Sequence, residues 1–253
     1  MRQQTKCVAV LCAAWFLTAS SPASAQMLRW EDKGYLGVNV GGQTLSRSFT
    51  ETSTPVIYNE NALFTVPHTV GSGLLFDVSG GMRVWRNLAI GLGFSSFSDS
   101  ESPTVTAQIP NPIAFGLLRP ASGSAGELSH SETAVHLQFV WMVPMSDKIE
   151  LAAVLGPSFF RIKQDFIGDV VPVEGPPPFT TVSLGAVTTR EESKSAAGVN
   201  IGIDGTYLLT KRIGAGMFLR WAGASADLAT SGGGTVTVDA GGFQVGGGLR
   251  YRF

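Results

Sequence analysis

Apolar and polar residues alternate with a period of two along several separate stretches of this chain. The stretch at residues 242–253 shows the pattern most clearly: Phe243, Leu249, Tyr251 and Phe253 share one face, and glycines and two arginines occupy the other. Alternation of this kind predicts a β-strand with one apolar and one polar face.

Seven further stretches show the same alternation. The predicted strands cover residues 35–42, 74–85, 88–97, 133–143, 149–163, 196–209, 213–224 and about 235–253. Past the first 25 residues, no apolar run approaches the ~20 residues that a membrane-spanning helix needs. A closed barrel pairs every backbone group without such runs. The sequence therefore predicts an all-β fold: an eight-stranded antiparallel up-and-down transmembrane β-barrel with long extracellular loops.

The connections between the predicted strands alternate between short and long. Short turns follow the second, fourth and sixth strands, whereas residues 43–72, 99–131 and 164–194 form connections of about 30 residues. Ten of the 13 prolines lie in these three connections. Short periplasmic turns and long outer loops are typical of membrane barrels. We also expect a hairpin above the membrane, with residues 170–173 paired to 181–184.

Aromatic residues give an independent check on this assignment. Those on the outward parity cluster near the two ends of the strands, as expected for two belts at the membrane interfaces. They are Trp141, Tyr207, Tyr251 and Phe253 at the periplasmic end, and Phe94, Phe159 and Trp221 at the outer end. Trp85 breaks the rule by falling on the inward parity, which indicates a bulge or a register error. Pro157 lacks an N–H for the ladder, so we predict a bulge there too.

The first 25 residues have the pattern of a secretory signal peptide. Arg2 and Lys6 give a basic start, residues 7–17 are apolar, and Ala23-Ser24-Ala25 supplies a cleavage site. We expect residues 1–25 to be removed and residues 26–253 to form the barrel domain. Lipidation at Cys12 is the alternative, and the position of Cys12 inside the apolar stretch argues against it.

Composition narrows the candidate chemistry. Both cysteines lie in the signal segment, so the mature chain has no thiol, disulfide or cysteine-ligated metal. Without Arg2 and Lys6 there are 16 basic residues against 19 acidic ones. No concentrated basic surface indicates a nucleic-acid partner. No ligand spacing indicates a metal or cofactor, and the glycine clusters lack the strand-to-helix context of a phosphate loop.

The inward faces of the predicted strands carry many charged residues. In a bore this narrow, unpaired charges are costly, so we expect them to pair into a structural network. Its predicted members are Asp77, Arg83, Glu150, Asp204, Arg220, Arg250 and Arg252, with His136, Gln138 and Gln244 beside them. The main interpretation is a network that plugs the lumen. The alternative is a gated narrow pore in which an Arg–acid pair changes partners.

The candidate catalytic cluster is the stretch Ser129-His130-Ser131-Glu132, because it contains a nucleophile, a base and a carboxylate, as acyl transfer requires. Neighbouring residues on a strand point to opposite faces, so His130 and Ser131 are not expected to meet. The stretch is therefore interpreted as polar loop residues. His68, in a loop flanked by prolines, is expected to be solvated. We expect no catalytic residues.

Across residues 26–253 the chain resembles the small bacterial outer-membrane β-barrel family of the OmpA membrane domain, OmpX and opacity-protein kind. The resemblance rests on the signal segment, the alternating strands, the alternation of short and long connections, and the terminal Leu249-Arg250-Tyr251-Arg252-Phe253. It implies an integral outer-membrane protein with both termini in the periplasm. It also implies that Tyr251 and Phe253 act as the signal read by the barrel-insertion machinery. We expect no periplasmic peptidoglycan-binding domain after the barrel.

The predicted function is a structural or surface-interaction role in the outer membrane. The expected partners are outer-membrane lipid, lipopolysaccharide and a surface ligand bound by the long loops. A narrow channel or conduit for small or hydrophobic solutes is the second interpretation, and a lipid A-modifying barrel enzyme is the third.

Overall fold

The computed structural model describes residues 30–44, 47–230 and 234–253. All the regular secondary-structure elements in these residues are β-strands. The expected signal peptide at residues 1–25 lies outside this described part. In the described part, no helix is long and apolar enough to cross a membrane.

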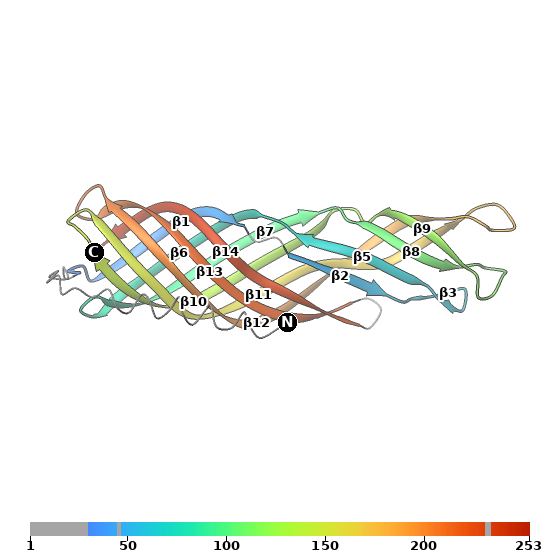
Figure 1. Cartoon of the computed structure of the whole chain (residues 1–253), viewed down its shortest axis with the longest axis horizontal. Helices are drawn as coiled ribbons and strands as arrows, with labels where there is room; N and C mark the ends of the chain where they lie inside the picture. The colour runs from blue at the N-terminus through green and yellow to red at the C-terminus, as the bar shows by residue number, and fades with distance from the viewer. Residues whose placement is uncertain (1–29, 45–46, 231–233) are drawn as a thin grey trace, which may run out of the picture.

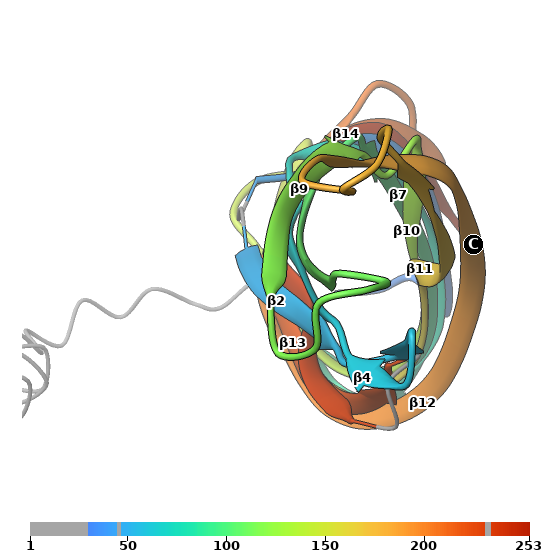
Figure 2. The ribbon, with the colours of Figure 1, turned by 90° about the vertical axis from the view of Figure 1, so that its right-hand side faces the viewer.

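Eight strands close into a ring in the order β1, β14, β13, β12, β11, β10, β7, β6. All neighbours are antiparallel, and β1 closes the ring by pairing with both β14 and β6. Figure 1 shows the strands tilted across the barrel, and Figure 2 shows the ring from its end. The strands are β1 (Gly34–Gln43), β6 (Gly73–Trp85), β7 (Leu88–Glu101), β10 (Leu128–Pro144), β11 (Ile149–Glu174), β12 (Val182–Leu208), β13 (Ile213–Ala229) and β14 (Thr235–Arg252).

The eight predicted strands and the all-β barrel are confirmed. At the end of the barrel that carries the short turns, the strand bounds agree with prediction to within about two residues. At the other end, β7, β10, β11, β12 and β13 run well past the predicted bounds. At ~3.3 Å per residue and a ~45° tilt, the 26 residues of β11 rise about 60 Å. The hydrocarbon core is ~30 Å thick, so β11 extends far beyond it.

The outward face of the barrel is a continuous apolar belt. Leucine, isoleucine, valine and aromatic side chains are exposed on all eight strands, as in Leu36, Phe76, Leu92, Phe139, Leu155, Ile203, Leu219 and Val245. The predicted outward aromatics are among these exposed residues. A water-soluble barrel would not expose so large an apolar surface, so the belt is the part that faces lipid.

The belt has a sharp outer limit at Phe94, Phe159, Trp221 and Phe243. Past this row the outward positions of the same strands become polar: Ser96 and Ser98, Arg161 and Lys163, Ser225 and Asp227, Asp239 and Thr237. From Ile149 to Phe159, β11 rises about 23 Å at a ~45° tilt, close to the ~25 Å apolar band of membrane barrels. The row therefore marks one boundary of the membrane-spanning part of the barrel.

Additional β-sheet, called the extension below, lies beyond this boundary, where long loops were predicted. β2 (Arg47–Ser53), β5 (Leu63–Val70), β8 (Thr104–Pro110) and β9 (Leu118–Ser124) form a four-stranded sheet, and β3 (Val56–Ile57) and β4 (Glu60–Asn61) form a small ribbon. β9 lies beside the extended β12, where Leu184 packs against Gly123. The right-hand part of Figure 1 shows this extension. The expected pairing of residues 170–173 with 181–184 is confirmed in part: Pro172 and Val173 lie opposite Leu184 and Ser183, whereas Val170 lies opposite Val187.

The extension has an apolar core of its own. Buried residues from β5, β8, β10 and β11 meet there: Phe64, Val66, Val105, Ala107, Ile109, Leu128 and Ile167, with Ala62 and Ala125 from the connections. Val182, Leu184 and Val187 of β12 pack against them. Burial of this surface explains why the three long connections are ordered sheet rather than loop.

Two irregularities differ in outcome. The predicted bulge at Pro157 is wrong: Pro157 pairs with Val199 in unbroken register, and the β10–β11 register is the same on both sides of it. The missing N–H is accommodated by a gap in the β10–β11 bridges opposite Leu137 and Gln138. Trp85, in contrast, does follow a bulge, because the β6–β7 register shifts between Arg83 and Trp85 and turns the Trp85 ring outward.

A charge placed on the lipid-facing belt should destabilise the barrel. Ile203 lies mid-belt between Ala153 and Leu219, so Ile203→Arg should lower the free energy of unfolding by about 2–4 kcal/mol. Urea titration of the protein in lipid vesicles measures the change. Ser100→Arg, on an exposed position above the belt, is the matched control and should change it by less than about 0.5 kcal/mol. Equal losses in both variants would contradict the membrane placement.

Candidate functional site

The short-turn end of the barrel is closed by an arginine and three aromatic or acidic partners. The guanidinium of Arg252 lies 2.6 Å from the Glu150 carboxylate, and its central carbon stands 5.4 Å from the Tyr35 ring and 5.9 Å from the Trp30 ring. Trp30 is only 1% exposed, and its backbone N–H donates to Asn87 Oδ1. The segment before β1 therefore covers the lumen from below.

A second layer of charge pairs crosses the middle of the lumen. Arg220 on β13 donates to Asp77 on β6 at 2.7 Å, and Asn39 on β1 donates to the other Asp77 oxygen at 2.9 Å. Arg250 on β14 pairs with Asp204 on β12 and also donates to Asn39. The pairs connect strands on several sides of the ring, so they brace it across its width.

Little space remains around these pairs. The lumen cavity beside Tyr35, Asp77, Asp204, Arg220 and Arg250 measures about 40 Å³. A water needs roughly 10–15 Å³ on this scale, so the cavity holds only a few waters. The charged layers fill the bore rather than line a passage.

Six of the seven predicted network residues form three carboxylate–guanidinium pairs: Asp77 with Arg220, Asp204 with Arg250, and Glu150 with Arg252. Arg83 lies apart from them at the turn end of β6, where it donates to the Trp30 carbonyl and stands 6.0 Å from the Trp30 ring. Tyr251 and Phe253 point outward at the lower edge of the belt, and their role as an insertion signal stays a prediction.

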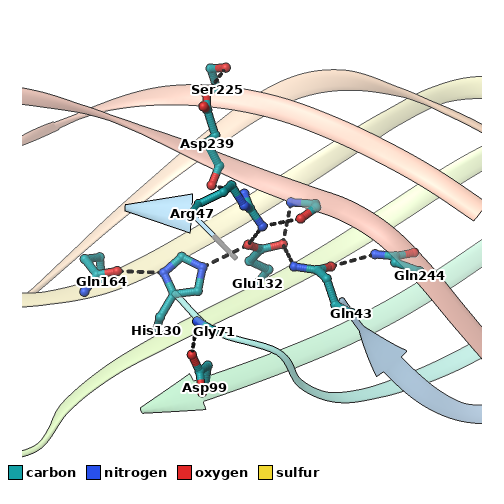
Figure 3. A network of polar contacts seen from close by, with 11 residues as sticks. Gln43, Arg47, Gly71, Asp99, His130, Glu132, Gln164, Ser225, Asp239 and Gln244 are labelled. Carbon is teal, nitrogen blue, oxygen red and sulfur yellow. Dashed lines mark hydrogen bonds and ion pairs between the residues drawn. The ribbon is translucent and has the colours of Figure 1, made fainter. Parts of the chain in front are cut away.

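A further polar cluster, centred on Glu132, lies at the barrel mouth (Figure 3). Glu132 accepts hydrogen bonds from Gln43, Arg47 and the Gly241 backbone N–H, and its Oε1 lies 2.9 Å from His130 Nε2. Gly241 has a φ of +85°, a conformation in which glycine is strongly favoured, and this aims its N–H inward. Arg47 comes from β2 and also donates to the Asp239 and Gly241 carbonyls, so the cluster fastens the extension to the barrel.

The expectation that Ser129-His130-Ser131-Glu132 is a polar loop is wrong. These residues belong to β10, and His130 and Glu132 are buried on its inner face while Ser129 and Ser131 face outward. The loop interpretation failed because β10 begins five residues before the predicted strand. The separation of His130 from Ser131 onto opposite faces agrees with prediction, so no nucleophile–base pair forms here.

His136 contacts two serines inside the barrel. Its Nε2 lies 2.9 Å from Ser95 Oγ and its Nδ1 lies 2.7 Å from Ser158 Oγ, which also accepts from Asn200. His136 and Ser158 are fully buried. A serine–histidine contact is a requirement for acyl transfer, yet here both ring nitrogens of the buried His136 contact serine hydroxyls, so the contact serves to fill hydrogen-bond positions.

His68 is the clearest error of the sequence-based expectations, which placed it in solvent. It is 0% exposed on β5, with Nδ1 2.9 Å from Glu101 and Nε2 3.1 Å from Glu51. The ring stacks on Phe49 at 4.7 Å and meets Phe166 edge-on. Burial by itself lowers the pKa of His68, but the hydrogen bonds to Glu101 and Glu51 outweigh it and raise the pKa.

The far tip of the extension is held by a buried ion pair. Arg119 on β9 pairs with Glu174 at the end of β11 and donates to the Phe179 carbonyl at 2.9 Å. Asn111 donates to the same carbonyl, and Tyr58 donates to Glu174 at 2.9 Å. The Arg119 hydrogen bond lowers the pKa of the Glu174 carboxyl. Three separate connections are thus joined at one point.

Sequence reasoning missed Arg47, Glu51, Glu101, Arg119 and Glu174, all of which lie in or border the extension. A signal was present: Phe64, Val66, His68 and Val70 alternate with exposed or half-exposed residues along β5. Pro67 in the middle of that stretch favoured a loop. Among the described residues, no group of three His, Asp or Glu side chains is arranged to hold a metal.

The closed ring, its apolar belt and its paired inner charges define the class: an eight-stranded membrane-spanning β-barrel. No protein-family model and no curated protein matches the chain. The solved structures similar to the chain include two outer-membrane proteins and a surface protein.

OprG of Pseudomonas aeruginosa is 10% identical, with a TM-score of 0.48 over 88% of this chain and 96% of OprG. Neisserial surface protein A is 10% identical, with a TM-score of 0.38 over 87% of this chain and 97% of that one. The Escherichia coli outer membrane protease OmpT is 9% identical, with a TM-score of 0.46 over 91% of this chain and 100% of OmpT. Likeness at this level carries nothing about activity, and the barrel rests on the strand pairing of the chain itself.

Removing one member of a buried charge pair should be far worse than removing both. Asp77→Asn leaves the Arg220 charge buried without its carboxylate and should lower the free energy of unfolding by about 3–5 kcal/mol. The double variant Asp77→Leu with Arg220→Met should recover most of that loss. Urea unfolding followed by tryptophan fluorescence measures both. A single variant within about 0.5 kcal/mol of the parent would show that the pair does not form.

Stability of the extension should fall as pH rises. The folded protein holds the His68 proton more tightly than the unfolded chain, whose pKa is near 6.5, so this stabilisation is present below about pH 6.5 and is lost as pH rises through the raised folded pKa. Limited proteolysis of the extension should therefore be faster at about pH 9 than at about pH 6. His68→Gln should remove the difference, measured with a protease of equal activity at both pH values. An unchanged pH dependence in that variant would contradict the assignment.

Proposed function

We propose that this chain is an integral protein of the bacterial outer membrane, with both termini in the periplasm, whose closed barrel carries a surface-interaction module. The observation that carries the proposal is the tip of the extension, where the chain exposes apolar side chains on a rigid support. Phe115 is 87% exposed, Val56 69% and Ile113 67%.

The support under these side chains is built rather than accidental. The 111–117 turn is held by Asn111, whose Oδ1 accepts the N–H groups of Ile113 and Ala114, and by Glu60, which accepts the N–H of Gly116. Gly116 has a φ of +77°, which permits the turn. The Arg119–Glu174 pair anchors the base of the same turn. A pre-ordered apolar tip binds a partner with less loss of conformational entropy than a flexible loop.

The interior of the barrel supports a scaffold role rather than transport. The ion pairs of the middle layer, the Arg252 layer and the Trp30 cover lie one after another along the bore. A cavity of about 40 Å³ is too small for any solute larger than a few waters. Passage would require the Asp77–Arg220 and Asp204–Arg250 pairs to separate together.

No catalytic role is proposed. All three histidines of the described part are buried, and both ring nitrogens of each contact protein groups. A general base must reach a substrate proton, and these buried rings already contact protein groups through both nitrogens.

The interaction role can be tested by measuring how cells that display this protein adhere to immobilised surface proteins. Cells producing this protein should adhere better than cells lacking it, and Ile113→Ser with Phe115→Ser should reduce the gain by about tenfold, because two apolar contacts are lost. Ser122→Ala, an exposed change on β9 away from the tip, is the control.

Conductance in planar bilayers tests the closed lumen. The protein should show no discrete voltage-stable steps. Steps together with an absence of adhesion would overturn the proposal and favour the narrow channel.

A further inference from the structure

A groove crosses the outer membrane boundary on the face formed by β10, β11 and β12. It measures about 330 Å³ and is lined by Thr133, Val135, Phe159, Phe160, Arg161, Ser195, Ala196 and Ala197. The strand register places these residues in rows that run across the three strands, so the groove can be described row by row along β11.

The lower row is apolar and the upper row is polar. Phe159 lies between Val135 and Ala197, and its ring is 61% exposed in the last apolar row of the belt. Directly above it, Arg161 lies between Thr133 and Ser195. One row higher, Lys163 lies between Ser131 and Ser193. The groove therefore runs from lipid-facing surface to Arg161. Lys163 lies one row beyond the groove, and four hydroxyl groups flank the two cations.

The two cations are available to a ligand. Arg161 donates only its Nε to Ser193 Oγ at 3.2 Å, and no carboxylate within the described ranges pairs with it. Lys163 lies 2.9 Å from Glu191, but both side chains are largely exposed and such a pair is weak. Arg161 and Lys163 are two residues apart on one face, about 7 Å along the strand. That spacing suits two oxygens of one phosphate-bearing headgroup.

The other strands carry a different charge at their outward positions above the belt. Above the belt, the outward positions of β13 and β14 carry Asp227 and Asp239 with no basic residue on those strands between 225 and 239. The outward positions of β7 and the start of β10 are serines and threonine. Arg190 and Lys194 add to the basic side, although Glu191 and Glu192 lie among them. The next outward residue of β11 above Lys163 is Asp165, so a membrane anion meets favourable charge chiefly at Arg161 and Lys163.

We propose that this groove binds a phosphorylated lipid of the outer leaflet, with an acyl chain on Val135, Phe159 and Ala197 and a headgroup phosphate on Arg161 and Lys163. Charge complementarity and the position of the groove select this occupant. Arginine binds phosphate through paired N–H groups. The acyl chain can bury apolar surface against the apolar row only when the headgroup lies beside the two cations. The inference rests on the proposed membrane placement of the belt.

Native mass spectrometry of the full chain in detergent tests the site with three probes: bisphosphorylated lipid A, the same lipid without phosphates, and inorganic phosphate. The phosphorylated lipid should bind about tenfold more tightly than the dephosphorylated one. Arg161→Gln with Lys163→Gln should abolish that preference. Ala197→Phe should weaken binding of both lipids by filling the apolar half. Lys211→Gln, an exposed cation in the turn between β12 and β13 at the opposite end of the barrel, should change neither.

Equal binding of the two lipids, or an unchanged preference in the double variant, would overturn the proposal. Full displacement of lipid A by inorganic phosphate at equal concentration would overturn the lipid assignment and leave a free-anion site. Each variant is first checked for a folded barrel by its tryptophan fluorescence. A barrel that folds and inserts but shows no preference refutes this site alone, whereas failure of the parent protein to insert refutes the proposed membrane function.

Discussion

Closure of the hydrogen-bonded ring in a lipid environment is the constraint on which the rest of this structure depends. A strand edge in hydrocarbon leaves backbone groups unpaired, so β1 must meet β14 as well as β6. Closing with only eight strands leaves a bore filled by side chains. Every inward residue must therefore find a partner across a narrow space, and Asp77, Asp204 and Glu150 each find an arginine there.

The polarity of the barrel inverts along its axis. Within the membrane, the outside is apolar and the inside is charged, with Leu219 outward and Arg220 inward on the same strand. Above the boundary, the outside becomes polar and the inside becomes apolar, as in the cluster around Phe64 and Ile109. The Glu132 cluster lies in the change-over zone, where Arg47 fastens the extension to the barrel wall. The same strands thus face lipid along one part of their length and water along the next.

The sequence was sufficient for the barrel and for much of its interior. Lipid makes the alternation strict, so residues such as Ile201 and Ile203 define the outward face without ambiguity, and inward charges follow by parity. The extension was harder to predict because its strands are short, contain Pro67 and Pro120, and form one sheet only through the pairing of β5 with β8, which lie far apart in sequence. His68 illustrates the cause: its burial depends on Glu51, Glu101, Phe49 and Phe166 from three other strands, and none of these contacts is visible in the local pattern. The bulge before Trp85 depends likewise on the β6–β7 register.

The central claim is that the belt ending at Phe94, Phe159, Trp221 and Phe243 spans the outer membrane and that the sheet above it stands outside the cell. The most direct test is electrophoresis of outer-membrane fractions, with and without heating, before and after protease treatment of whole cells. The account predicts a band whose mobility changes on heating and which protease trims only down to a barrel-sized core. A band found in the soluble periplasmic fraction, with mobility unchanged by heating, would contradict it.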